Sequence, residues 1–215
     1  DLLACVQGIV LRAIAHMARD YHFVHAGAVS WNNRGVILPG NSGTGKSTLA
    51  VKLILQGFEL LSDEVACLVP DRGTVAPFPR QLTFCDESRK LNSLPPWPDQ
   101  KARTLETGER EWAVEIDDIA PSRLSEACPL CYIVFLKGFG EKTRLEPLAP
   151  SLALFSLPGH SLSPSHDKAS LLFELAPLVD RAQCFNLVQG DIDEVAEVML
   201  NLVSRPPVFR QGHPR

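Results

Sequence analysis

Eight consecutive residues, GNSGTGKS at positions 40–47, have the types and spacing needed to hold a phosphate. Gly40 is followed after four residues by Gly45, Lys46 and Ser47. Glycines let backbone N–H groups point at phosphate oxygens, the lysine reaches the β- and γ-phosphates, and the serine hydroxyl can bind Mg²⁺. The segment therefore predicts a nucleotide-binding loop with ATP and Mg²⁺ as its ligands. The residues expected to contact them are Gly40, Asn41, Ser42, Gly43, Thr44, Gly45, Lys46, Ser47 and Thr48.

Two adjacent acids, Asp63 and Glu64, follow the lysine at a distance of seventeen residues and lie at the end of an apolar segment. One carboxylate can bind Mg²⁺ while the other accepts a proton from an attacking hydroxyl, as phosphoryl transfer to an alcohol requires. Successive side chains of a strand point to opposite sides, so both acids reach one nucleotide only if the strand ends or bends at Ser62. The alternative is an exposed pair of acids at a strand end, without a catalytic role.

The residues around the loop predict the elements that position it. Residues 23–31 and 36–38 are typical of strands and are separated by a turn at 32–35. A helix is predicted from Ser47 to Gln56, with Gly57 as its left-handed cap. Residues 58–61 and 65–69 are expected to form strands on either side of the two acids. This alternation predicts an α/β fold with a mixed central sheet and flanking helices.

The remaining segments give weaker signals. We expect an N-terminal helix at 1–20 that packs one apolar face on the core, and a middle region, 77–125, of short antiparallel strands and loops. The domain prediction is one domain at 1–205, followed by a loose tail at 206–215. The other predicted elements are a strand at 131–136, a helix at 151–157, a mobile loop at 158–167, a strand at 184–188 and a helix at 191–203 capped by Asp191 and Glu194.

Composition narrows the class of protein. The net charge is −4 and the pI is near 5.9, so no global basic field favours nucleic acid or an anionic membrane as a partner. Six cysteines are spread over a 215-residue chain that is long enough to fold without disulfides. Cys128 and Cys131 form a CxxC pair without a second half-site, and we expect them to be structural. These features predict a cytoplasmic protein with free thiols.

The segment FVHAGAVSWNNRGVILPGNSGTGKSTLAVKLILQGFELLSDEV resembles the catalytic core of the HPr serine kinase/phosphorylase family. His25, Lys46, Asp63 and Glu64 fall on the family's pattern, with twenty-one residues from His25 to Lys46. The close match covers about residues 23–69. The later segments PFPRQL, IVFL and NLVQGDIDEV are more similar to shortened relatives that act as serine kinases in peptide-modification gene clusters, including those acting on lasso-peptide precursors. The resemblance implies a P-loop kinase core of HPr-kinase type.

The resemblance also implies a role for each matching residue. Asp63 would deprotonate the substrate hydroxyl, Glu64 would join Ser47 around Mg²⁺, and His25 would orient the catalytic acid or the γ-phosphate. The chain departs from the family where Glu64 replaces an aspartate and where Gln56-Gly57-Phe58 replaces Arg-Gly-His. No segment matches the RGLGI signature associated with phosphorolysis, so neither phosphorylase activity nor HPr as the substrate is expected.

Phosphoryl transfer also favours a second positive charge beside Lys46. Arg80 is the first candidate and Arg144 the second, and the alternative for both is a solvated surface charge. The function predicted is an ATP-dependent serine kinase that acts on a peptide or small protein, including a ribosomally made precursor peptide. A homo-oligomer is compatible with the resemblance. A small-molecule kinase and a non-catalytic, regulatory nucleotide-binding protein remain alternatives.

Overall fold

The computed structural model describes residues 10, 13–14, 17–18, 20–85, 102–104, 108, 110–162 and 168–205. The predicted tail at 206–215, part of the middle region and part of the loop at 158–167 lie outside these residues. Within the described part of the chain, no helix has both the length and the apolar character needed to cross a membrane.

A mixed sheet of eight strands forms the centre, in the order β10-β11-β9-β2-β1-β4-β5, with β3 also paired to β1. The pairs β2–β9 and β9–β11 are parallel, and the others are antiparallel. The mixed sheet with its helices confirms the predicted α/β fold class. The strands are β1 (His22–Trp31), β2 (Arg34–Pro39), β3 (Glu59–Ser62), β4 (Val65–Val69), β5 (Thr74–Ala76), β9 (Cys128–Phe139), β10 (Arg144–Pro147) and β11 (Gln183–Gln189).

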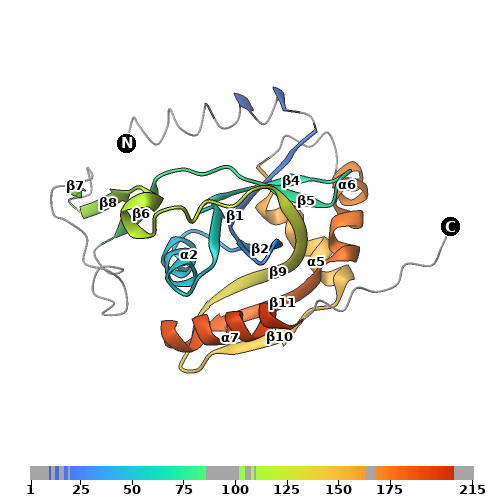
Figure 1. Cartoon of the computed structure of the whole chain (residues 1–215). Coiled ribbons are helices and arrows are strands. Elements are labelled where there is room, and N and C mark those ends of the chain that lie inside the picture. The colour runs from blue at the N-terminus through green and yellow to red at the C-terminus, as the bar shows by residue number, and fades with distance from the viewer. Residues whose placement is uncertain are drawn as a thin grey trace.

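Helices cover both faces of this sheet (Figure 1). Ile37 and Ile133 face α5 and α6, whereas Val36 and Val134, their neighbours along the strands, face α2 and α7. This alternation is the strand periodicity of two, and it makes both sheet faces apolar. The helices are α2 (Lys46–Leu55), α4 (Ile116–Ile119), α5 (Pro150–Ser156), α6 (Lys168–Arg181) and α7 (Ile192–Ser204), with a 3₁₀ turn, η2 (Leu157–His160), after α5.

A second, three-stranded antiparallel sheet supports α2 from another side. Its order is β6-β8-β7, with β6 (Leu82–Cys85), β7 (Ala102–Thr104) and β8 (Arg110–Val114). Val51 and Ile54 of α2 pack with Trp112 of β8 in a buried cluster. The prediction of short antiparallel strands in the middle region is therefore confirmed. Because this sheet and α7 both contact α2, the helix that follows the glycine loop is held on several sides.

Two turns next to the loop follow from local sequence. Asn32 and Asn33 have φ of 48° and 60°, as a two-residue β-hairpin of type I′ requires, and they join β1 to β2. At the end of α2, Gly57 has φ of 103°, and its N–H donates to the Ile54 carbonyl. The next N–H, of Phe58, donates to the Leu53 carbonyl, which completes a Schellman cap. Both predictions, the turn and the glycine cap, are confirmed.

Three predictions were wrong or incomplete. Helix α6 was not predicted, and Pro177 lies inside it. The segment predicted as a loop at 158–167 begins with part of the 3₁₀ turn η2, and the Leu162 N–H donates to the Phe23 carbonyl at 2.8 Å. The N-terminal segment is helical at the residues described, but Val10 and Met17 of its apolar face are 50% and 84% exposed. The packing expected for that face is wrong at these positions, since helix pairs already cover both faces of the sheet.

Candidate active site

The glycine loop lies between the end of β2 and the start of α2, and its shape depends on its glycines. A Cβ atom on Gly40 would lie 2.6 Å from the Thr44 hydroxyl oxygen and 3.0 Å from the Leu136 Cβ. Gly43 and Gly45 have φ of 78° and 80°, in the left-handed region that other residues rarely adopt. The backbone therefore turns tightly enough for its N–H groups to converge on an anion.

The positive end of α2 and one lysine supply charge to the loop. Gly45 is the N-cap, no side chain makes a capping hydrogen bond to it, and the first turn of α2 contains no acid of its own. The Lys46 Nζ donates to the carbonyls of Gly40 and Asn41, at 2.9 Å in each case, and so spans the loop. Burial lowers the pKa of Lys46, while the charges of Glu64 and Asp63 act in the opposite direction. The lysine thus binds the loop and lies near enough to both acids for their charges to act on it.

Asp63 lies beside the loop, where β3 stops and β4 has not begun. Strand β3 ends at Ser62, as the convergence of the two acids on one site requires. Asp63 is only 4% exposed and accepts hydrogen bonds from the Ser47 hydroxyl and the Thr83 backbone N–H. Burial and then the charge of Glu64 raise its pKa to about 6, although both hydrogen bonds and Arg80 oppose that shift. A buried carboxyl group with such a pKa is a candidate proton acceptor.

Glu64 also lies between β3 and β4, but its side chain is partly exposed. Its carboxylate accepts from the Arg80 guanidinium at 2.9 Å, and the Glu64 and Arg80 side chains are 48% and 28% exposed. The structure therefore brings Arg80 to the site, in contact with the second acid. Arg144 lies instead on β10 with an exposed side chain that is 3.9 Å from Glu146.

His25 of β1 and a second histidine lie near enough to Lys46 for its charge to act on both rings. Burial and the charge of Lys46 lower the pKa of His25, against the effect of Glu64. His160 was not predicted, and burial followed by the charges of His25, Lys46 and Lys137 lowers its pKa. His160 and Lys137 also border a cavity of about 160 Å³ at the loop. The cavity is lined by Pro39, Asn41, Thr44, Phe135, Leu136, Lys137 and His160.

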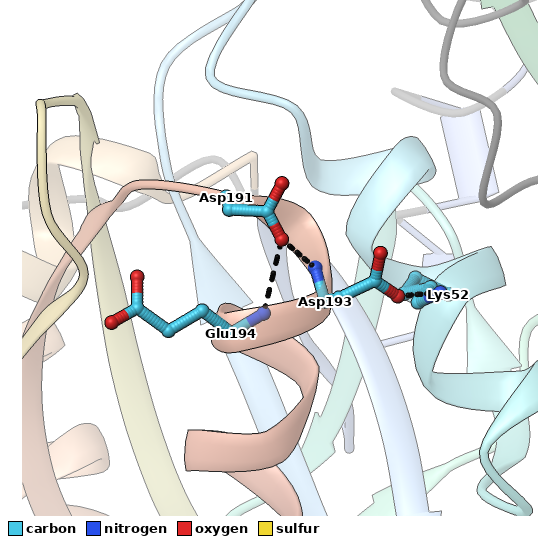
Figure 2. A network of polar contacts seen from close by, with 4 residues as sticks. All are labelled: Lys52, Asp191, Asp193 and Glu194. Atoms are coloured by element: carbon cyan, nitrogen blue, oxygen red, sulfur yellow. Dashed lines mark hydrogen bonds and ion pairs between the residues drawn. The ribbon is translucent and has the colours of Figure 1, made fainter.

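The end of β11, just before α7, contacts the glycine loop and stabilises it. Gln189, which is buried at the end of β11, donates from Nε2 to the Thr44 carbonyl at 2.7 Å. Figure 2 shows the start of α7, where Asp191 caps the N–H groups of Asp193 and Glu194 and where Asp193 forms an ion pair with Lys52 of α2. Asp191 is the predicted cap, whereas the Glu194 carboxylate accepts from the Thr143 N–H. Gln189 was missed because only the fold brings it to the loop.

The site fits a nucleotide that brings its own Mg²⁺. Magnesium prefers oxygen ligands, and it usually binds through one or two protein groups together with phosphate oxygens. The Ser47 hydroxyl and the carboxylates of Asp63 and Glu64 offer such oxygens beside a glycine cradle. Within the described ranges, no group of three His, Cys, Asp or Glu side chains could hold a metal by itself. Cys128 and Cys131 are buried free thiols at the start of β9, as expected of structural cysteines.

Comparisons with known proteins give a distant structural likeness. No family model matches the sequence, and no curated protein matches it. One of the solved structures that match is that of the Hpr(Ser) kinase/phosphatase from Coxiella burnetii, which is 13% identical with a TM-score of 0.39. The match covers 85% of this chain and 93% of that chain. Both the identity and the TM-score are low, so the description of the site rests on the geometry of this chain.

Proposed function

We propose that the protein is an ATP-dependent phosphotransferase that places a phosphate on a serine hydroxyl of a peptide or small protein. The observation that carries the proposal is the position of Asp63, a buried carboxyl group within hydrogen-bond reach of Ser47 in the phosphate loop. Hydrolysis by a phosphate loop needs one acid for the metal, whereas transfer to an alcohol also needs a group that accepts the alcohol's proton. This chain has two acids at the loop.

The two acids can divide these tasks because their surroundings differ. Asp63 is buried, and its pKa of about 6 lies near neutral pH, where a general base is most effective. Glu64 is partly exposed and balanced by Arg80, which suits a carboxylate that lies near a cation. In this proposal Asp63 accepts the proton, Glu64 and Ser47 hold Mg²⁺, and Lys46 neutralises the phosphates. Bound Mg²⁺ would supply positive charge that stabilises the transferring phosphoryl group.

Two further groups support transfer. His25 has a lowered pKa, so at neutral pH its ring is uncharged and can donate or accept a hydrogen bond between Lys46 and Glu64. His160, in the 3₁₀ turn η2, borders the cavity beside the loop. We propose that the protein acts in the cytoplasm.

The direct test is a transfer assay. The protein is incubated with MgATP and a panel of serine-containing peptides, and intact mass is measured for the addition of one phosphate. We expect Asp63→Asn to lower transfer by a factor of about 10²–10⁴, the usual contribution of a general base, while binding of MgATP is kept. Asp117→Asn is the matched control, because Asp117 is an acid in the first turn of α4 whose carboxylate accepts from the Ser122 N–H. If Asp63→Asn transfers phosphate as well as the unmodified protein, Asp63 is not the general base.

One observation favours a second candidate, a small-molecule kinase. The cavity at Lys137 and His160 has a volume of about 160 Å³, which suits a small acceptor better than an extended peptide. The same assay therefore includes free amino acids and sugars, with ATP consumption as the readout. Consumption of ATP with these acceptors and without phosphate gain by any peptide would favour the second candidate.

A further inference from the structure

We propose that Phe139 is the surface on which the aromatic base of the nucleotide stacks. The inference rests on the proposed function, because it assumes that the glycine loop holds the phosphates of a nucleotide. It adds the binding site of the base, for which the phosphate-loop motif contains no residue.

Phe139 is unusual for its strand. Strand β9 is largely buried from Cys128 to Leu136, whereas Phe139 at its end is 68% exposed. The ring nevertheless lies close to the loop, since its Cζ atom is 3.1 Å from the position that a Cβ would take on Gly45. An exposed aromatic ring leaves a large apolar surface in contact with water, and aromatic side chains in nucleic-acid-binding proteins are platforms on which bases stack. The ring edge therefore lies against the loop at Gly45, where α2 begins.

The backbone fixes the ring relative to the loop. Phe139 pairs with Gln189 of β11 in the parallel ladder, and the register shifts between Leu187 and Gln189 at this end. The side chain of Gln189 in turn donates to the Thr44 carbonyl. The next residue, Gly140, donates its N–H to the Gln189 carbonyl at 2.8 Å. One hydrogen-bonded unit thus joins the strand end that carries Phe139 to the loop that would hold the phosphates.

The direction of a bound nucleotide follows from the sheet order. Asp63 accepts a hydrogen bond from Ser47, the loop residue whose hydroxyl binds Mg²⁺ in this motif, so the γ-phosphate end is expected to face Asp63 and Glu64. These acids follow β3, which pairs with β1, on one side of β2. Strands β9 and β11 lie on the other side of β2. The nucleoside is then expected to leave the loop over β9 and β11, which lie together in the sheet (Figure 1), and Phe139 is the last residue of β9.

The experiment compares two ligands that differ by the nucleoside. Affinities of the full chain for ATP and for inorganic tripolyphosphate, both with Mg²⁺, are measured by titration calorimetry. Phe139→Leu keeps apolar bulk but removes the ring, and we expect it to weaken ATP binding about tenfold, as the loss of one base–aromatic stack does, and to leave tripolyphosphate binding unchanged. Phe155→Leu is the matched control, because Phe155 on α5 is also exposed. Phe139→Trp is expected to keep ATP affinity and to gain a fluorescence change with ATP alone.

The outcomes separate the inference from the function on which it rests. Unchanged ATP affinity in Phe139→Leu, or equal weakening of ATP and tripolyphosphate, would overturn stacking and leave the phosphate site intact. Failure of the unmodified protein to bind either ligand would overturn the proposed function and the inference together. Loss of ATP affinity alone, restored by Phe139→Trp, would support the inference, since a residue that only stabilises the fold would not distinguish between the two ligands.

Discussion

The two acids at the end of β3 differ in chemistry because they differ in burial. Asp63 is enclosed, and the free-energy cost of burying its charge exceeds the gain from the Ser47 and Thr83 hydrogen bonds, so its pKa rises. Glu64, one residue later, faces Arg80 with nearly half of its side chain exposed. The proposed division of tasks, with Asp63 as proton acceptor and Glu64 as metal ligand, rests on this difference in burial.

The contact of Arg80 with Glu64 predicts an effect on activity that is separate from folding. A partly exposed ion pair contributes at most about 1 kcal/mol to stability. We therefore expect Arg80→Gln to change the free energy of unfolding by less than about 1 kcal/mol, measured in urea. Transfer is expected to fall more steeply, because Glu64 then carries an unbalanced charge beside the nucleotide. A loss of stability that accounts for the lost activity would contradict this prediction.

The loop and helix α2 were predictable as elements because their signals are local. Glycine spacing marks the loop, Asn32-Asn33 marks the hairpin before it, and Gly57 marks the end of α2. Helix α6 was not predictable in this way, since Pro177 interrupts a helical pattern that only packing stabilises.

The hydrogen bond from Gln189 of β11 to the Thr44 carbonyl predicts an effect on nucleotide binding. In Gln189→Leu the part-buried Thr44 carbonyl loses the donor that the buried Gln189 side chain supplies, so the loop conformation should be less stable. An unsatisfied buried group costs about 1–3 kcal/mol, and we expect affinity for MgATP to fall about tenfold. The affinity of Gln189→Leu for tripolyphosphate should fall by the same factor, whereas Phe139→Leu should lose affinity for ATP alone. Titration calorimetry measures both affinities. Gln183→Leu, at the opposite end of β11, is the control and should bind both ligands normally.

The cap of α2 gives a prediction about stability. Gly57→Ala places a Cβ at φ of 103° and 3.1 Å from the Trp31 ring. Strain and crowding together are expected to cost about 1–3 kcal/mol in the free energy of unfolding. Gly159→Ala is a matched control, because a Cβ there has open space and its φ is not positive. Equal stability of the two variants in urea would show that the Schellman geometry is not required.

At the scale of the whole molecule, the C-terminal half of the chain completes the site. Lys137, Phe139 and Gln189 reach the loop because β9 lies parallel to β2, with β11 beside it. His160 is held there because the next residue, Ser161, bridges Val24 of β1. The sequence predicted the residues of the phosphate motif and the acids, whose spacing along the chain is diagnostic. It could not predict these four, since their relation to the loop depends on long-range strand pairing. Phe139 lies between two glycines in the sequence, and this pattern indicates no function until the fold shows that the ring lies beside Gly45.

Buried His22 joins the two halves of the chain and predicts a dependence of stability on pH. It lies on β1, its Nε2 contacts the Ser161 hydroxyl at 3.0 Å, and its Nδ1 is 3.7 Å from Glu174 of α6. Burial lowers its pKa to about 4, so the ring is neutral at pH 7 and the contact with Glu174 is not an ion pair there. The unfolded chain takes up this proton below about pH 6.5, whereas the folded chain does so only near pH 4. Stability is therefore lost as pH falls through this window.

A comparison of His22→Gln with the unmodified protein isolates the contribution of His22 to the pH dependence of stability. Between pH 7 and pH 5 the His22 contribution should lower the free energy of unfolding by about 2 kcal/mol. Asp63 acts with the opposite sign, because its raised pKa makes the folded state bind a proton first, so the net slope of the unmodified protein is smaller. His22→Gln keeps a neutral polar side chain and removes the titration, whereas Asp63 remains. Urea unfolding at both pH values should show a loss that is about 2 kcal/mol smaller in His22→Gln than in the unmodified protein. Equal losses would mean that His22 is protonated as readily in the folded chain as in the unfolded one.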